Sequence, residues 1–240
     1  MSQVTTITLF RYEGLQQKLW AFGMMQFAHR YLKNVGGLEF YKLWGSGKAN
    51  FNPAPDWNVY ALLQVWKSEQ DANHFFETSA LMKKYHKKSA ELWCLFLKNR
   101  ISRGEWTGRN PFEVSKSLDE SNPYVVAITR ATIKTKLLYT FWKYVPVSQG
   151  GLYDNPGLLY TKGFGEVPIK HMATFSVWAS QKDLDAFAYQ NKPHAGAIRK
   201  TRSLKWYSEE LFSRFQPFRS EGSWGGKNPL HKLDPNKGKV

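Results

Sequence analysis

Hydrophobic and polar residues alternate in several short segments, and between these segments apolar residues recur at helical spacing. Alternation predicts strands over residues 4–11, 38–45, 57–66 and 94–98 in the first half, and over 125–129, 157–164, 171–178 and 212–218 in the second. Helical spacing predicts helices over 15–33 and 68–92, then over 134–144, from Ser180 through Ala188, and over about 195–211. Each half therefore follows the order β-α-β-β-α-β, which is that of a ferredoxin-like unit.

Three segments of the first half recur in the second in the same order. Residues 103–112 (RGEWTGRNPF) match 221–230 (EGSWGGKNPL), residues 37–45 (GLEFYKLWG) match 157–165 (GLLYTKGFG), and residues 65–71 (VWKSEQD) match 177–183 (VWASQKD). The offsets are 118, 120 and 112 residues. Such internal similarity indicates a tandem duplication, in which any asymmetry between the halves points to function.

The duplication predicts an α+β fold in which two ferredoxin-like units pack into a pseudo-dimeric barrel with helices outside. We place the first repeat at residues 1–112, a linker at 113–122, the second repeat at 123–230 and a basic tail at 231–240. The barrel interior, or the inner face of one sheet, is expected to offer an apolar cavity. Aromatic residues make up 16% of the chain and include ten tryptophans, which suit a core, an interface or the pocket of a flat ligand.

The formal net charge of +15 is spread over both halves and favours anionic partners. The sequence has no arginine-rich stripe, zinc-finger spacing or RNA-binding motif, so specific nucleic-acid binding is not expected. The single cysteine, Cys94, lies in an apolar run and excludes an intramolecular disulfide. With no signal-peptide pattern and no apolar run of about 18–20 residues, the prediction is a cytoplasmic protein, either soluble or peripheral on the inner membrane.

Among the six histidines, His171 and His194 have no counterpart in the first half. His171 opens a strand after a Gly-Glu-Val-Pro turn, and His194 follows Pro193 and precedes the small residues 195–197. A neutral imidazole with a flat apolar surround and a nearby arginine is what haem requires, because the nitrogen binds iron and the cation pairs with a propionate. Each of the two also fits a hydrogen-bonded surface or capping residue.

The other histidines have simpler interpretations. His74 and His86 lie on a lysine-rich helix, His231 lies in the basic tail, and His29 lies on the first helix. No histidine–carboxylate constellation points to zinc or non-haem iron, and no nucleotide-binding or serine-hydrolase motif is present.

The chain resembles the spheroidene monooxygenase family of carotenoid-modifying enzymes over nearly its whole length. The segments that carry the resemblance are residues 19–23 (LWAFG), 42–47 (KLWGSG), 158–168 (LLYTKGFGEVP), His171, 174–178 (TFSVW), 193–195 (PHA), 197–199 (AIR), 209–211 (EEL), 214–215 (RF) and 220–226 (SEGSWGG).

The resemblance implies an oxidoreductase that carries non-covalent haem. Members of this family hydroxylate a terminal carbon of acyclic carotenoids twice, with dioxygen and electrons from reduced ferredoxin, and the geminal diol loses water to give a ketone. The positive surface would then attract anionic membrane headgroups or acidic ferredoxin. Among the positions that match the family, His194 is the expected axial iron ligand and His171 the second candidate. Arg199 is the expected partner of a haem propionate, and Arg130 is a weaker candidate for that role.

Two other classes of function stay open on the sequence alone. One is a haem- or lipophile-binding α+β barrel protein, or a haem enzyme with a different apolar substrate. The other is a structural barrel with no cofactor. Haem content would separate a structural barrel without a cofactor from the haem-binding functions. Turnover of an acyclic carotenoid would separate the carotenoid oxygenase from a binding protein.

Overall fold

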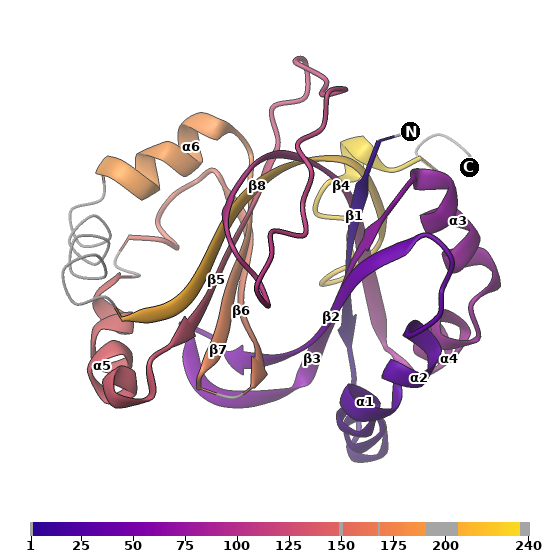
Figure 1. Cartoon of the computed structure of the whole chain (residues 1–240), viewed down its shortest axis with the longest axis horizontal. Coiled ribbons are helices and arrows are strands. Elements are labelled where there is room, and N and C mark those ends of the chain that lie inside the picture. Colours follow the sequence, from indigo (N-terminus) through magenta and orange to yellow (C-terminus); the bar gives the residue numbers. More distant parts are fainter. Residues whose placement is uncertain (1, 149–150, 168, 191–205, 236–240) are drawn as a thin grey trace.

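The computed structural model describes residues 2–148, 151–167, 169–190 and 206–235. Its described strands form one closed antiparallel barrel in the order β1-β3-β2-β6-β7-β5-β8-β4 (Figure 1). The strands are β1 (Val4–Arg11), β2 (Leu38–Lys48), β3 (Asn52–Trp66), β4 (Glu91–Gly104), β5 (Val125–Ile133), β6 (Leu158–Val167), β7 (His171–Trp178) and β8 (Tyr207–Gly222). The predicted α+β barrel is confirmed.

The helices lie outside the barrel. They are α1 (Leu15–Phe27), α2 (His29–Leu32), α3 (Glu69–Thr78), α4 (Ala80–Lys88), α5 (Leu138–Ser148) and α6 (Gln181–Asp185), with short helical turns η1 (Thr135–Leu137), η2 (Ala186–Gln190) and η3 (His231–Leu233). In the described part of the chain, none of these helices combines the length and the apolar character needed to cross a membrane.

The strand order is the same in each half, because β4-β1-β3-β2 and β8-β5-β7-β6 occupy matching places in the barrel. The register also matches: Val4 and Leu38 both pair with Trp66, and Val125 and Leu158 both pair with Trp178. Residues that share a register position are called equivalent below. Duplication as the origin of this match stays a prediction.

A hydrophobic cluster shared by both halves fills the barrel interior. It contains alternate strand residues such as Ile7 and Ile128, together with the large rings of Trp44, Trp93 and Phe164. The expectation of an apolar cavity inside the barrel is therefore wrong, because the inward-facing aromatic side chains occupy that space.

The repeated decapeptides add to this interior. Residues 103–112 contribute Trp106 and Phe112 to the buried cluster, and residues 221–230 contribute Leu230, with Trp224 packed against it. The motif recurs because each half needs a segment that returns from the end of a long strand and packs against the core. Its repetition is explained by packing.

The first glycine of each decapeptide is required by the backbone. Gly104 has a φ of 93° and Gly222 a φ of 84°, in the left-handed region that favours glycine. A Cβ atom at either position would lie 2.1 Å from a backbone carbonyl oxygen, that of Glu210 or that of Leu92.

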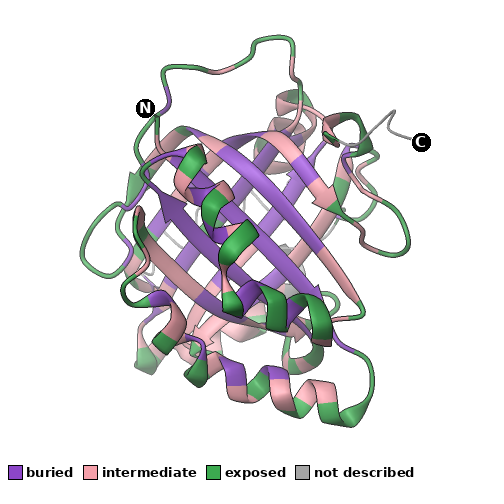
Figure 2. Ribbon diagram, turned by 90° about the vertical axis from the view of Figure 1, so that its right-hand side faces the viewer, coloured by how far each residue is buried: buried purple, intermediate pink, exposed green. Residues whose placement is uncertain are grey.

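Helices α1–α4 pack on the outer face of the first half (Figure 1), and Figure 2 shows them crossing in front of the buried strands. Beneath them lies a second cluster that includes Phe10, Leu62, Trp66 and Phe96. On the second half the corresponding cluster is small and contains Val125, Ala127, Leu152, Trp178 and Leu184. Among the described residues, the outer face of the second half thus has fewer buried side chains than that of the first.

Two predicted elements differ from the observed ones. The helix expected over 68–92 is broken at Ser79, whose Oγ accepts hydrogen bonds from the N–H groups of Leu81 and Met82 and so starts α4. The helix expected to run to Leu211 is wrong over its last residues, because β8 begins at Tyr207 and pairs there with β5 and then also with β4. The N-cap predicted at Ser180 is confirmed: its Oγ accepts the N–H of Asp183 at 3.2 Å.

Candidate functional site

The outer face of the second half carries small residues where the first half carries large ones. At equivalent positions Phe10, Tyr41, Leu43 and Leu62 of the first half are replaced by Ala131, Thr161, Gly163 and Thr174. We call the surface formed by Thr129, Ala131, Thr161, Gly163 and Thr174 the small-residue face. These strand positions of the second half therefore contribute less side-chain volume to the outer face than their first-half equivalents do.

One pair of equivalent threonines shows the difference directly. Thr8 on β1 is 0% exposed. Thr129, at the same register position on β5, is exposed. The centre of the small-residue face is therefore open to a ligand that lies flat against the strands.

Aromatic side chains border this half of the molecule. The ring of Phe51 reaches across from the β2–β3 turn, so that a Cβ added to Gly163 would lie 3.0 Å from its Cδ1 atom. Phe141 of α5 packs edge-on against Trp206 with ring centroids 5.7 Å apart. Trp178 stacks on Phe187 at 5.6 Å. Flat apolar walls beside a small-residue floor suit a broad, planar, apolar ligand.

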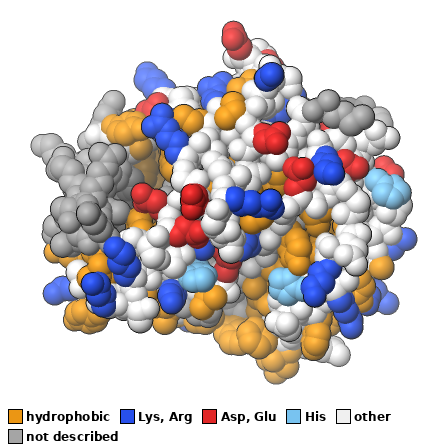
Figure 3. All heavy atoms as spheres, in the orientation of Figure 1, with side chains coloured by type: hydrophobic (Ala, Val, Ile, Leu, Met, Phe, Trp, Pro, Cys, Tyr) orange, Lys and Arg blue, Asp and Glu red, His pale blue; other side chains and the backbone are white. Residues whose placement is uncertain are grey.

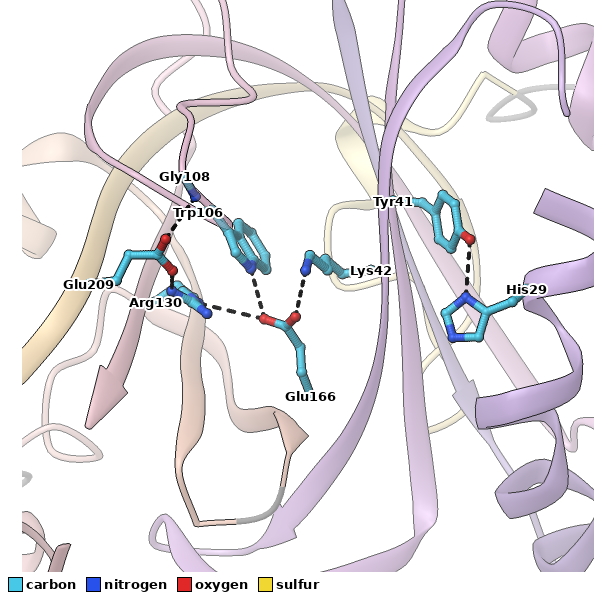
Figure 4. A network of polar contacts seen from close by, with 8 residues as sticks. All are labelled: His29, Tyr41, Lys42, Trp106, Gly108, Arg130, Glu166 and Glu209. Carbon is cyan, nitrogen blue, oxygen red and sulfur yellow. Dashed lines mark hydrogen bonds and ion pairs between the residues drawn. The ribbon is translucent and has the colours of Figure 1, made fainter. Parts of the chain in front are cut away.

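A charged network lies at one end of the barrel, on the other side of the same strands (Figure 4). Its centre is the carboxylate of Glu166, which lies 2.7 Å from Lys42 Nζ and accepts a hydrogen bond of 2.7 Å from Trp106 Nε1. Arg130 Nε lies 3.6 Å from the same carboxylate. Lys42 belongs to the first half and Glu166 to the second, so this ion pair joins the halves beside the short β2–β6 seam.

Arg130 is the most buried charge of this network, at 2% exposure. It also pairs with Glu209, which accepts the N–H of Gly108 at 2.9 Å. Burial opposes ionisation of Glu209, but the N–H groups of Gly108 and Thr107 and the charge of Arg130 hold its pKa below the ordinary value. The network thus ties the first decapeptide to the second half.

Arg130 and Glu166 of the network, and the neighbouring His171, have uncharged equivalents in the first half, whereas Glu209 has Glu91 as its equivalent. Leu9 stands in the place of Arg130, Val59 in that of His171, and Ser46 in that of Glu166. The asymmetry found in the sequence at His171 therefore extends to two further residues. Comparing the two halves position by position would have revealed Glu166, which the sequence reasoning missed.

His171 lies at the start of β7, half-buried, on the strand side that carries Ala173 and Phe175 of the interior cluster. Burial, and next the positive charge of Arg130, lower its pKa below the ordinary value, although Glu166 opposes this. This shift favours the neutral form of the imidazole. The structure brings His171 together with Arg130, and both lie on the side of the sheet opposite to the small-residue face.

The other candidate site residues cannot be placed in the same way. His194 and Arg199 lie outside the described residues. Within the described ranges, no group of three or more His, Cys, Asp and Glu side chains is positioned to hold a metal ion. Haem iron needs only one protein ligand, so the fit of haem rests on the shape and polarity of the face that would hold the macrocycle.

Comparison with solved structures places the chain in a class of α+β barrels. A crystal structure of aldoxime dehydratase superposes with a TM-score of 0.63 at 10% identity, covering 90% of this chain and 82% of that one. A second aldoxime dehydratase, in complex with butyraldoxime, gives a TM-score of 0.61 at 11% identity and covers 90% and 80%. At these identities the likeness concerns the fold alone.

Sequence comparison identifies the family. The chain is 36% identical to spheroidene monooxygenase of Rhodobacter capsulatus over 230 residues, which is 95% of each chain. It is 32% identical to the spheroidene monooxygenase of Cereibacter sphaeroides, covering 95% of this chain and 71% of that one. No family model matches the sequence. The chain belongs to the spheroidene monooxygenase family, which confirms the predicted resemblance and the assignment as an oxidoreductase.

Proposed function

We propose that this protein is a haem-dependent monooxygenase that hydroxylates and ketonises an acyclic carotenoid with dioxygen and reduced ferredoxin. The observation that carries the proposal is the 36% identity to a spheroidene monooxygenase, spread over 95% of both chains. A match of that extent covers the strands, the helices and the connections that form the small-residue face. The protein acts in the cytoplasm, where reduced ferredoxin is available.

The small-residue face supports haem as the cofactor. A planar macrocycle needs a broad surface with few projecting side chains, and Thr129 and Thr174 provide small side chains beside the ring of Phe51, which lies against Gly163. When bound, haem supplies the activation of dioxygen that insertion of oxygen into a C–H bond requires. The aromatic walls exclude water from such a site and offer an apolar path to the end of a polyene.

The residues proposed to hold haem follow from the family resemblance. His194 is the proposed iron ligand and Arg199 the proposed partner of a propionate. His171 is the second candidate for the ligand, but it lies on the opposite side of the sheet, so it would require haem to bind on that side and not on the small-residue face. Arg130 is a weaker propionate candidate, since Glu166 and Glu209 already engage its guanidinium.

A haem- or lipophile-binding barrel without turnover is the second candidate function. The small-residue face favours it as well, because a flat apolar ligand can occupy that surface without reacting. A haem enzyme with a different apolar substrate would use the same face. We also infer that the two halves arose by duplication of a ferredoxin-like unit, and that the second half then lost the side chains that fill the first.

The proposal is tested by the absorption spectrum of protein purified from haem-replete cells, with wild type beside His194→Ala and His171→Ala. We expect a Soret band in the wild type and in His171→Ala, and its loss in His194→Ala. Loss in His171→Ala alone would move the ligand to His171. A wild type without a Soret band, even after reconstitution with hemin, would contradict a haem-dependent reaction.

A further inference from the structure

Helix α1 is apolar on both of its sides. Ala21 and Met24 are buried against the barrel. Leu15, Leu19 and Phe22, spaced at i, i+4 and i+7, form a second stripe that is 74%, 58% and 56% exposed. Large apolar side chains in a row on the solvent side of a helix are normally covered, so this outer stripe calls for a partner.

The stripe continues onto neighbouring residues. Trp57 of β3 is 45% exposed, and its ring centroid lies 5.1 Å from that of Phe22. Phe27, the last residue of α1, is also exposed. We call Leu15, Leu19, Phe22, Phe27 and Trp57 the α1 patch. Figure 3 shows hydrophobic side chains gathered at the lower edge of the molecule, where α1 protrudes.

The surroundings of the α1 patch are basic. No acidic residue occurs between Glu13 and Glu39, whereas Lys18, Arg30 and Lys33 fall in this stretch. Helix α4 adds exposed lysines, and its Lys84 lies 2.6 Å from the hydroxyl of Tyr31 in α2. Exposed aromatic and leucine side chains beside lysines and arginines are the pattern of a surface that lies in a membrane interface.

We propose that the α1 patch docks the protein on an anionic lipid bilayer, with its apolar side chains at the level of the headgroups and the lysines and arginines against lipid phosphates. This inference adds a docking surface to the proposed function and needs neither haem nor turnover.

The position of α1 also relates the bilayer to the second half. Figure 1 places α1, the turn between β6 and β7, and α5 along the same lower edge of the molecule. Exposed apolar side chains continue along this edge at Tyr139 of α5, at Val167 of β6 and at Ile169 in the turn. A protein docked through α1 would therefore present the second half to the membrane, where a carotenoid resides.

The test is flotation with vesicles of phosphatidylcholine alone or mixed with phosphatidylglycerol. Wild type is expected to float with the mixed vesicles and to be released by high salt. The double variant Leu19→Glu/Phe22→Glu is expected to bind the mixed vesicles about tenfold less than wild type. It loses two apolar side chains that would insert into the bilayer and gains two negative charges that the anionic lipids repel. The matched control is Val114→Glu in the β4–β5 connection, at a position 59% exposed, and it is expected to bind like wild type.

The docking proposal is overturned if wild type does not float, or if the double variant floats as wild type does. It is also overturned if the variant loses binding to reduced ferredoxin and keeps its binding to vesicles, since the patch then serves an acidic protein. Circular dichroism checks the fold, and Leu19→Gln/Phe22→Gln replaces the double variant if that one unfolds. Turnover in detergent micelles reports on the proposed function separately, because it needs no vesicle.

Discussion

Thr129→Phe is expected to weaken haem binding by about ten- to hundredfold while the barrel stays folded, because overfilling a packed site costs about 1–3 kcal/mol. Thr129 is exposed, so the ring meets no buried neighbour in the ligand-free protein. With haem bound, the same ring would occupy the centre of the small-residue face. Titration of the haem-free protein with hemin, followed at the Soret band, measures the change.

The control for this variant is Thr129→Ser, which keeps the side chain small and is expected to bind hemin like wild type. Near-ultraviolet circular dichroism shows whether both variants keep the native packing. If Thr129→Phe binds hemin with wild-type affinity, the macrocycle does not lie on the small-residue face and the cofactor site has to be sought elsewhere.

Arg130→Leu is expected to lower the free energy of unfolding by about 3–5 kcal/mol, the cost of breaking a buried ion pair by removing one partner. The substitution installs the residue found at the equivalent first-half position, Leu9. Among the described residues, Glu209 then has no cationic partner and Glu166 keeps Lys42. Urea unfolding monitored by tryptophan fluorescence gives the value.

The double variant Arg130→Leu/Glu166→Ser places both first-half equivalents in the second half. It is expected to recover about 1 kcal/mol or more of the loss, since residues of one network show coupling energies of about 0.5–3 kcal/mol. If the two single losses simply add, the two residues act independently and the network has no cooperative role.

Much of the architecture could be predicted from the sequence because strands alternate with a period of two and helices do not. This pattern located every strand of the barrel and the N-cap at Ser180. It failed at residues 207–211, where Glu209, Glu210 and Leu211 suit a helix locally but are held in β8 by pairing with neighbouring strands. It also could not show that the interior is full, because alternation reveals an apolar face without revealing how many rings meet inside.

The site was only partly predictable. Asymmetry between the repeats singled out His171, which has no counterpart in the first half. In the structure Arg130 lies beside His171, and its first-half equivalent is the uncharged Leu9. The small-residue face was missed, because exchanges such as Leu43 for Gly163 and Leu62 for Thr174 remove side chains and leave no chemical signature. Their meaning appears only when register shows that these positions share one outer face.

Incubation of the haem-loaded protein with spheroidene, reduced ferredoxin and dioxygen, followed by chromatography and mass spectrometry of the carotenoids, tests the proposed reaction. We expect hydroxylated and ketonised products that form only when protein, ferredoxin and dioxygen are all present. Recovery of unchanged spheroidene, from protein that carries haem and receives electrons, would contradict the assigned reaction and leave a barrel that binds haem or a lipophile without oxidising a carotenoid.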